Sequence, residues 1–540
     1  MTLYFSIRKP ENLIPFLIIF IFFMLNFSSV LREFSQTADE DKHYLYGERL
    51  TSGDSTRFDD SKMPVTALNA VPKKVASLLG PGKVSQVLSR FYVARSVTVL
   101  FSCLLAFLVF HWTRQLFGFV PALFSLLIFV LDPNIIAHSQ LVTTDIYVTA
   151  SIFFAFFALW KFLNNRTTKN GIICLVALGL SQIAKYTSIV LYPLFFVLLI
   201  IFDLSALQVS WQKPKNVRVF VQRYLKYFSL TILVSLLIIN VGFLFNRTFT
   251  YFGEYRFVSQ TLQNLQVDFS VLYFLPVPLP YPYLQGLDLI HHNEQTGASY
   301  GNLYLLGQIA EKDGFTGYFL IASLLKVPIA TQIIIFLAFF SYFLKQDRFK
   351  NFLTNEFFLL LPVLFFTIYL NFFFNTQIGI RYYLPVFPFL YVFSGRLFLG
   401  WENFTAIQKK MSYIAILYLA VSTLSYYPYH LSYFNEIVFD RKQGYKYLAD
   451  SNIDWGQDKN ELDQYLLDHP DTIYNPSNPR SGHFVVRVND IVGVTTDPNK
   501  YAWLRNNFEP VDTIAYSYLV YRISTEEIDQ LCTFSNYCDK

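Results

Sequence analysis

Eleven apolar segments of roughly membrane-spanning length dominate this sequence. A bilayer core about 30 Å thick requires about 20 mainly apolar residues per helix, within a range of about 17 to 25. The candidate spans are residues 13–30, 93–113, 117–131, 146–162, 170–184, 187–203, 227–245, 317–344, 357–374, 383–399 and 411–427. The pair around Lys185 is also consistent with one long broken helix. The pattern predicts a polytopic α-helical membrane protein with about eleven transmembrane helices.

Composition excludes a soluble protein. The 540 residues are 53% hydrophobic and only 15% charged, whereas soluble domains are roughly one-quarter charged. The formal net charge of +5 is small, and the basic residues lie between apolar segments instead of forming one block. Nucleic acid is therefore not the expected partner, and the positive charge bears on topology.

Lysine and arginine in short loops mark the cytoplasmic face of a membrane protein. With the spans threaded in order, one face receives Arg8-Lys9, Arg114, Lys161 with Arg166 and Lys169, Lys213 through Lys226, Lys345 with Arg348 and Lys350, and Lys409-Lys410. The opposite loop, 132–145, contains neither residue. The first apolar run lacks a small-residue cleavage site, so we expect a retained span. These features predict an odd number of spans, a cytoplasmic N-terminus and an extracytoplasmic C-terminus.

Three outward segments are long enough to carry function: 31–92, 246–316 and 428–540. We expect a transmembrane module over 1–427, which includes the first two, and a small extracytoplasmic α/β domain over 428–540. The latter contains the strand-like runs His483–Val488 and Ile514–Ile523. Cys532 and Cys538 in its tail are candidates for a disulfide if that compartment is oxidising.

The first outer segment opens with an acidic cluster, Asp39-Glu40-Asp41, followed by His43. A solvated juxtamembrane loop explains these residues without any function. Glu40 and His43 also have the spacing of a helical metal-ligand pair, but no second pair accompanies them, so a metal site ranks lowest.

Three charged residues near predicted span ends are further candidates. Asp145 is either a helix N-cap, a functional carboxylate, or both. Lys185 stands between two apolar segments, where an ionisable side chain is costly and favours an anionic partner, although snorkelling to the interface is the alternative. Arg381 is a second outward cation. The alternative explanation for it is an ion pair with lipid headgroups at the interface. Together these cations predict a phosphate-bearing ligand. No Walker glycine loop, Ser-His-Asp signature or clustered zinc spacing occurs.

The order of these motifs resembles the GT-C superfamily of polyprenyl-phosphate-sugar-dependent glycosyltransferases, and within it glycosyltransferase family 39, the protein O-mannosyltransferase and aminoarabinose transferase group. The matching segments are Asp39-Glu40 continuing to His43, Gly53-Asp54, His138 through Asp145, Ala184-Lys185-Tyr186, Arg381-Tyr382 through Pro388, Tyr433 through Glu436, and Asp450 through Asp458. The chain departs from the group at Lys62-Met63-Pro64, where many members have His-Pro-Pro.

The resemblance implies inverting transfer of a sugar from a polyprenyl-phosphate donor to an acceptor hydroxyl on the extracytoplasmic side, with no cofactor and no metal. Asp39 would be the general base, and Glu40 and Asp145 would orient the acceptor or polarise the site. Lys185 and Arg381 would hold the leaving phosphate. The further substrate-binding candidates are His43, His138 and Tyr382. The acceptor would be a protein, a lipid or a cell-wall glycan, and the setting a bacterial inner or plasma membrane.

Two alternatives remain open at this point. A transporter or flippase of lipid-linked sugars would also bind anionic lipids with intramembrane charges, but its halves commonly carry repeat symmetry, and no internal repeat is evident. An oligosaccharide transferase or polymerase would belong to the same superfamily. However, Asp454-Trp455 lacks the Trp-Trp-Asp signature of the oligosaccharyltransferase subunit.

Overall fold

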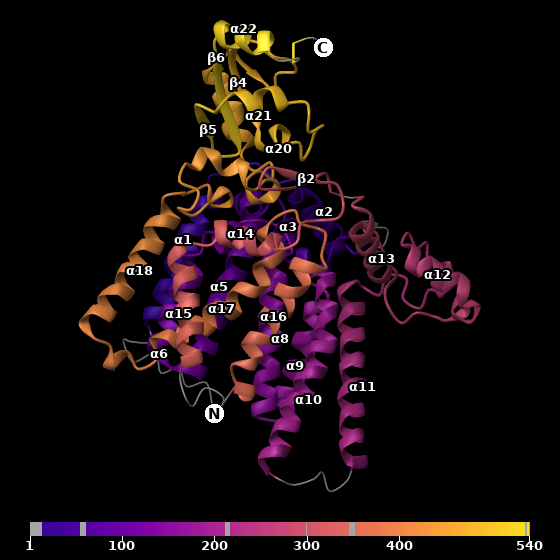
Figure 1. Ribbon diagram of the computed structural model, residues 1–540. Coiled ribbons are helices and arrows are strands. Elements are labelled where there is room, and N and C mark those ends of the chain that lie inside the picture. Colours follow the sequence, from indigo (N-terminus) through magenta and orange to yellow (C-terminus); the bar gives the residue numbers. More distant parts are fainter. Residues whose placement is uncertain are drawn as a thin grey trace.

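The computed structural model describes residues 13–54, 61–210, 217–298, 300–344, 352–534 and 537–538. Long helices form one body, and a small sheet lies beyond one end of it (Figure 1). The helices are α1 Leu13–Val30, α2 Glu40–Thr51, α3 Ala67–Leu79, α4 Lys83–Leu88, α5 Phe91–Phe117, α6 Phe119–Val130, α7 Pro133–Ser139, α8 Asp145–Asn164, α9 Thr168–Gln182, α10 Leu191–Ser210, α11 Val217–Gly242, α12 Gln260–Asp268, α13 Tyr281–Thr296, α14 Tyr318–Lys326, α15 Ile329–Leu344, α16 Phe357–Phe372, α17 Phe387–Ser394, α18 Ala406–Leu424, α19 Lys459–Asp468, α20 Val488–Ile491, α21 Ala502–Asn507 and α22 Thr525–Phe534. The strands are β1 Leu303–Leu305, β2 Gln308–Ala310, β3 Thr472–Tyr474, β4 Gly482–Arg487, β5 Asp512–Ile514 and β6 Tyr518–Ile523.

The prediction of a polytopic helical membrane protein is confirmed. Among the described residues, five segments are long and apolar enough to cross a membrane: Leu13–Val30, Phe91–Phe117, Asp145–Asn164, Tyr186–Asp203 and Gln222–Gly242. The pairs α6–α7, bent by 63°, and α14–α15, bent by 117°, raise the number to seven if each counts as one span. The other four predicted spans also fall on helical structure, but α9, α16, α17 and α18 are too short or too polar to meet this criterion, so it yields fewer spans than the predicted eleven.

Orientation stays a prediction. Several of the basic residues on which it depends lie outside the described residues: Arg8, Lys9, Lys213, Lys345, Arg348 and Lys350.

Turn chemistry explains where the helices break. Gly118, at φ 97°, separates α5 from α6, and such a dihedral favours glycine. Asp132 then caps α7 by accepting hydrogen bonds from the backbone N–H groups of Asn134 and Ile135 at 2.7 and 3.0 Å, with Pro133 at the first helical position. All seven residues of α7 are buried, and so are residues 140–144, which connect it to α8.

The C-terminal sheet has the strand order β3-β4-β6-β5. β3 runs parallel to β4, whereas β4 and β5 both run antiparallel to β6. The run Ile514–Ile523, predicted as one strand, is instead the end of β5 and the whole of β6. Ala515 and Tyr516 have φ values of 51° and 64°, which turn the chain between the two strands. A disulfide joins Cys532 to Cys538, whose Cα atoms are 5.3 Å apart.

The segment between α18 and the sheet packs back onto the helical body. Buried Lys326 of α14 donates from Nζ to the carbonyls of Leu431 and Asn452. Asn435 bonds the carbonyls of Leu324 and Val327 through its side-chain amide. These contacts hold the segment against the end of α14.

Candidate active site

Asp39 lies at the start of α2, just after the chain leaves α1. Its Oδ2 accepts a hydrogen bond from Arg381 Nη1 at 3.1 Å. The Asp39 side chain is 28% exposed and that of Arg381 only 7%. The carboxylate is thus reachable from outside, while the cation that holds it is buried.

Asp145, the first residue of α8, is the second carboxylate of this cluster and is almost fully buried. Lys185 Nζ donates to its Oδ1 at 2.9 Å, and Thr143 Oγ1 donates to its Oδ2 at 3.1 Å. Arg381 Nη1 lies 3.9 Å from the same Oδ2. Arg381 therefore stands between Asp39 and Asp145, and the structure brings together four of the residues predicted from the sequence.

Both cations stand on irregular backbone. α9 ends at Gln182, Lys185 is extended with φ −161° and ψ 145°, and a 3-10 turn over Tyr186–Val190 follows. Lys185 thus separates two helices. Arg381 is the second residue of another 3-10 turn, Ile380–Val386, which follows Gly379. Gly379 has φ 134°, and a Cβ there would meet Ser451 Oγ at 2.1 Å, so this approach requires glycine.

Two aromatic rings flank the cations. Lys185 Nζ lies 4.3 Å and Arg381 Cζ 5.2 Å from the centre of the Tyr382 ring. The guanidinium also lies 4.0 Å from the centre of the Trp455 ring. Such contacts stabilise a cation in a partly dehydrated place. Trp455 is tied to the acidic loop as well, because its carbonyl accepts from the Ala38 N–H at 2.9 Å.

Glu40 faces away from this cluster. Arg95 of α5 clamps both of its carboxylate oxygens, at 2.9 and 2.6 Å, and the N–H groups of Thr37 and Val142 donate to it at 3.0 and 2.9 Å. The pair is buried, with Glu40 fully so. Glu40 therefore joins the loop before α2, helix α5 and the loop before α8, and its oxygens are already committed to four donors.

His43 and His138 are both buried near the cluster. Among the described residues, Nδ1 of each ring has no hydrogen-bond partner. The His138 ring lies 6.2 Å from that of Trp455. Burial, aided by the charge of Lys62, lowers the pKa of His43 to about 3, so this imidazole is neutral at pH 7.

The cluster keeps Asp39 ionised. Burial alone raises the pKa of Asp39, but the charges of Arg381 and Lys62 outweigh it and hold the pKa below its usual value. The nearby Asp450 behaves differently. Burial raises the pKa of Asp450 to about 6, against the lowering influence of Arg381. Asp39 is thus charged throughout the neutral pH range, whereas Asp450 titrates near pH 6.

Sequence reasoning missed four residues that shape this site: Arg95, Trp455, Asp450 and Lys62. Trp455 and Asp450 lie in a segment that carried the family resemblance, and that was the available signal. Lys62 stands where many members of the group have a histidine. Nothing in the sequence marked Arg95 as the partner of Glu40.

Among the described residues, no group of three or more His, Cys, Asp or Glu side chains could hold a metal ion. The Glu40–His43 pair considered above is not available as a ligand pair, since Arg95 and two backbone N–H groups already occupy the Glu40 carboxylate.

One family model matches part of the chain. Residues 87–238 match the model of the family PMT_2, described as dolichyl-phosphate-mannose-protein mannosyltransferase. Over those residues the match agrees with the resemblance to the protein O-mannosyltransferase group. No curated protein matches the chain.

Two solved structures of ArnT from Cupriavidus metallidurans are similar to the chain. The apo structure is 15% identical, covers 74% of this chain and has a TM-score of 0.46. The chain spans 61% of that solved chain. The structure bound to undecaprenyl phosphate is 12% identical, with 95% of this chain and 98% of that chain covered and a TM-score of 0.47.

Proposed function

We propose that the protein is a membrane glycosyltransferase that moves a sugar from a polyprenyl-phosphate donor to an acceptor hydroxyl on the extracytoplasmic side. The observation that carries this proposal is the cluster of Asp39, Asp145, Lys185 and Arg381, in which one cation bridges two carboxylates. The family match over residues 87–238 supports it independently, because that segment includes both Asp145 and Lys185.

The leaving phosphate would be held by the two cations. Without substrate, Lys185 and Arg381 pair with Asp145 and Asp39. A donor phosphate competes for these cations, and Arg supplies a bidentate fork where Lys supplies a point charge. As the glycosidic bond to the phosphate breaks, negative charge grows on the leaving group, and two preorganised cations stabilise it. Their charges supply the stabilisation that a metal would otherwise give.

Asp39 would act as the general base. It takes the proton of the acceptor hydroxyl while the hydroxyl oxygen attacks the anomeric carbon and the carbon–oxygen bond to phosphate breaks. Polyprenyl phosphate leaves, and this single displacement inverts the anomeric centre. When the donor phosphate draws Arg381 away from Asp39, the main lowering influence on the Asp39 pKa weakens, so the carboxylate becomes more basic at the moment it is needed.

The remaining predicted residues have supporting parts in this proposal. The Tyr382 ring orients both cations, and the buried imidazoles of His43 and His138 offer hydrogen bonds to sugar or acceptor. Asp145 aligns Lys185, whereas Glu40 positions the acidic loop through Arg95. The acceptor is a protein, a lipid or a cell-envelope glycan.

The proposal places the site at the outer surface of a bacterial inner or plasma membrane, with residues 428–540 as an extracytoplasmic domain. A donor chain in the bilayer and a water-borne acceptor would then meet at the ends of α1, α8 and α9.

The test is a donor panel. Purified protein in lipid nanodiscs is incubated with polyprenyl-phosphate hexoses and pentoses and with an envelope extract, and products are identified by mass spectrometry. We expect one donor to be consumed with release of polyprenyl phosphate and a glycosylated product, in the presence of EDTA as well. Movement of intact donor between leaflets without cleavage would instead favour a flippase.

A further inference from the structure

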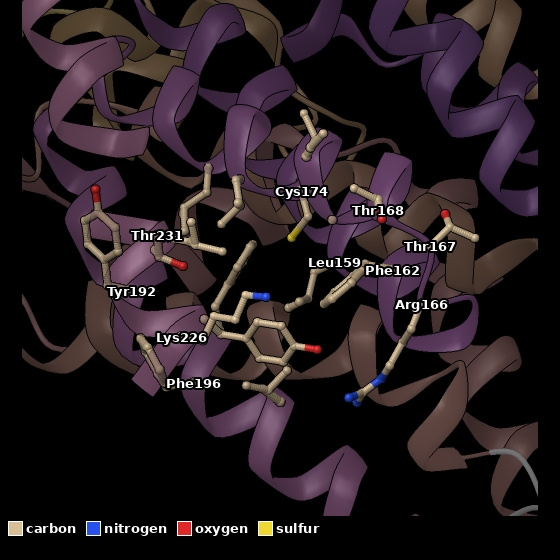
Figure 2. Close-up of a pocket in the computed structure, with 18 residues that line it drawn as sticks. Leu159, Phe162, Arg166, Thr167, Thr168, Cys174, Tyr192, Phe196, Lys226 and Thr231 are labelled. Carbon is tan, nitrogen blue, oxygen red and sulfur yellow. The ribbon is translucent and has the colours of Figure 1, made fainter. Parts of the chain in front are cut away.

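A groove between four membrane helices lies apart from the candidate active site. It has a volume of about 300 Å³ and is lined by residues of α8, α9, α10 and α11. Its wall is mostly aromatic and aliphatic, with side chains such as Phe162, Leu178, Phe195 and Leu199. Figure 2 draws the lining residues as sticks, with Phe162, Tyr192 and Phe196 among those labelled.

The groove is about as long as one leaflet is thick. Along α9 its lining runs from Thr168 to Leu178, a rise of about 15 Å along the helix. That distance is half of a bilayer core about 30 Å thick. α9 then continues toward Lys185, so the groove begins at the opposite end of this helix from the candidate active site. Figure 1 shows the same end of α9 turned away from the C-terminal sheet.

Two basic residues lie at the mouth of the groove, and they differ in their partners. Arg166 is bonded to Asp203, which also accepts from Tyr224. Lys226 of α11 has no carboxylate partner among the ion pairs of the described residues. In Figure 2 the Lys226 amino group points toward the centre of the lining side chains, whereas the Arg166 guanidinium lies at their edge. Lys226 is exposed at the mouth of an apolar groove, where its charge can pair with an anionic lipid headgroup.

The geometry points to a binding site for an anionic glycerophospholipid, with one hydrocarbon chain in the groove and the headgroup phosphate on Lys226. The apolar wall matches a hydrocarbon chain, and the hydroxyl groups of Thr167, Thr168 and Tyr227 lie at the same end as the cation. A volume at the small end of ligand pockets, which run from about 300 to 1,000 Å³, suits one chain of one leaflet rather than a long polyprenyl chain. The lipid would fill the space between α9 and α11 and hold the two helices together.

The test measures lipid binding and not sugar transfer, so its outcome is independent of the proposed function. Delipidated full-length protein in detergent is titrated with phosphatidylglycerol, phosphatidylcholine or polyprenyl phosphate, and binding is followed by native mass spectrometry and by the midpoint of thermal unfolding. We expect phosphatidylglycerol to bind and to raise the midpoint, with Lys226→Gln weakening its binding about fivefold, the effect of one basic residue near a lipid surface.

Two further variants serve as a control and as a test of the groove itself. Lys161 lies near the C-terminal end of α8, with its amino group over the Phe157 ring, and it does not line the groove. Lys161→Gln should therefore leave lipid binding unchanged. Thr231→Phe should fill the groove and abolish binding while Lys226 remains. Equal binding of phosphatidylcholine, preferential binding of polyprenyl phosphate, or unchanged phosphatidylglycerol binding in both groove variants would each overturn the assignment.

Discussion

Arg381 Nη1 donates a hydrogen bond to Asp39 Oδ2 at 3.1 Å, although the two residues are 342 positions apart in the sequence. The same nitrogen lies 3.9 Å from Asp145. A single buried guanidinium thus joins the acidic loop after α1, the start of α8 and the turn before α17. Any ligand that binds Arg381 changes the surroundings of both carboxylates at once.

Replacing Arg381 should damage both donor binding and the state of Asp39. We expect Arg381→Gln to lower kcat/KM for the donor by about 10²–10³, the usual cost of losing a preorganised donor to developing charge. Arg381→Lys keeps the charge but loses the fork, and it should retain intermediate activity. Steady-state kinetics with the donor found in the panel measures both variants, and wild-type kinetics in Arg381→Gln would remove this residue from the phosphate site.

Lys185 should act on the donor more than on the acceptor. Because its ammonium group lies at 2.9 Å from Asp145 and beside Tyr382, we expect Lys185→Ala to raise KM for the donor about tenfold while KM for the acceptor changes little. Lys73→Ala, which removes a half-exposed lysine paired with Glu48, is the matched control. An unchanged donor dependence in Lys185→Ala would argue against phosphate binding there.

The four residues of the central cluster could be predicted from the sequence because each departs from its local rule. Lys185 and Arg381 are cations on the face predicted to be poor in them, Asp39 lies in an acidic cluster of the first outer segment, and Asp145 directly precedes an apolar run. Their distances could not be predicted. The Arg381–Asp39 contact depends on Gly379 passing Ser451, which is a tertiary feature with no local signal.

Other features followed from packing that no pattern reveals. Glu40 stood next to Asp39 in the sequence and was expected to orient the acceptor or polarise the site, yet one step along α2 turns it toward Arg95 of α5. Likewise, the run Ile514–Ile523 has the composition of one strand, but Ala515 and Tyr516 adopt positive φ values and divide it. Side-chain direction and turn conformation, rather than composition, decided both outcomes.

Glu40 should matter for stability first. Glu40→Gln leaves a buried Arg95 without its counter-charge, and breaking a buried pair in this way costs about 3–5 kcal/mol. Glu48→Gln breaks the more exposed pair with Lys73 and should cost no more than about 1 kcal/mol. Chemical unfolding of the two variants in the same detergent compares them. Equal stability of the two would contradict a structural role for Glu40.

Asp450 should make donor binding depend on pH. Its pKa of about 6 means that its side chain is neutral below pH 6 and negative above it. The negative form interacts with the Arg381 guanidinium and so competes with the donor phosphate for that cation. We expect KM for the donor to rise about fivefold from pH 5 to pH 7.5, which is about 1 kcal/mol, the interaction of two unit charges about 4 Å apart in water. Asp450→Asn should flatten this profile, and Asp463→Asn, at an exposed position of α19, should not. Asp39 stays ionised across this range because its pKa is held below the usual value.

The central claim is that Asp39 is the base of a sugar transfer. Its most direct test is product formation by Asp39→Asn beside Asp41→Asn, which removes the exposed carboxylate two positions along α2. Both variants should unfold at the wild-type temperature. We predict that Asp39→Asn loses at least about a hundredfold in sugar transfer, as expected for a general base, while Asp41→Asn retains wild-type activity. Full transfer activity in folded Asp39→Asn would contradict the mechanism.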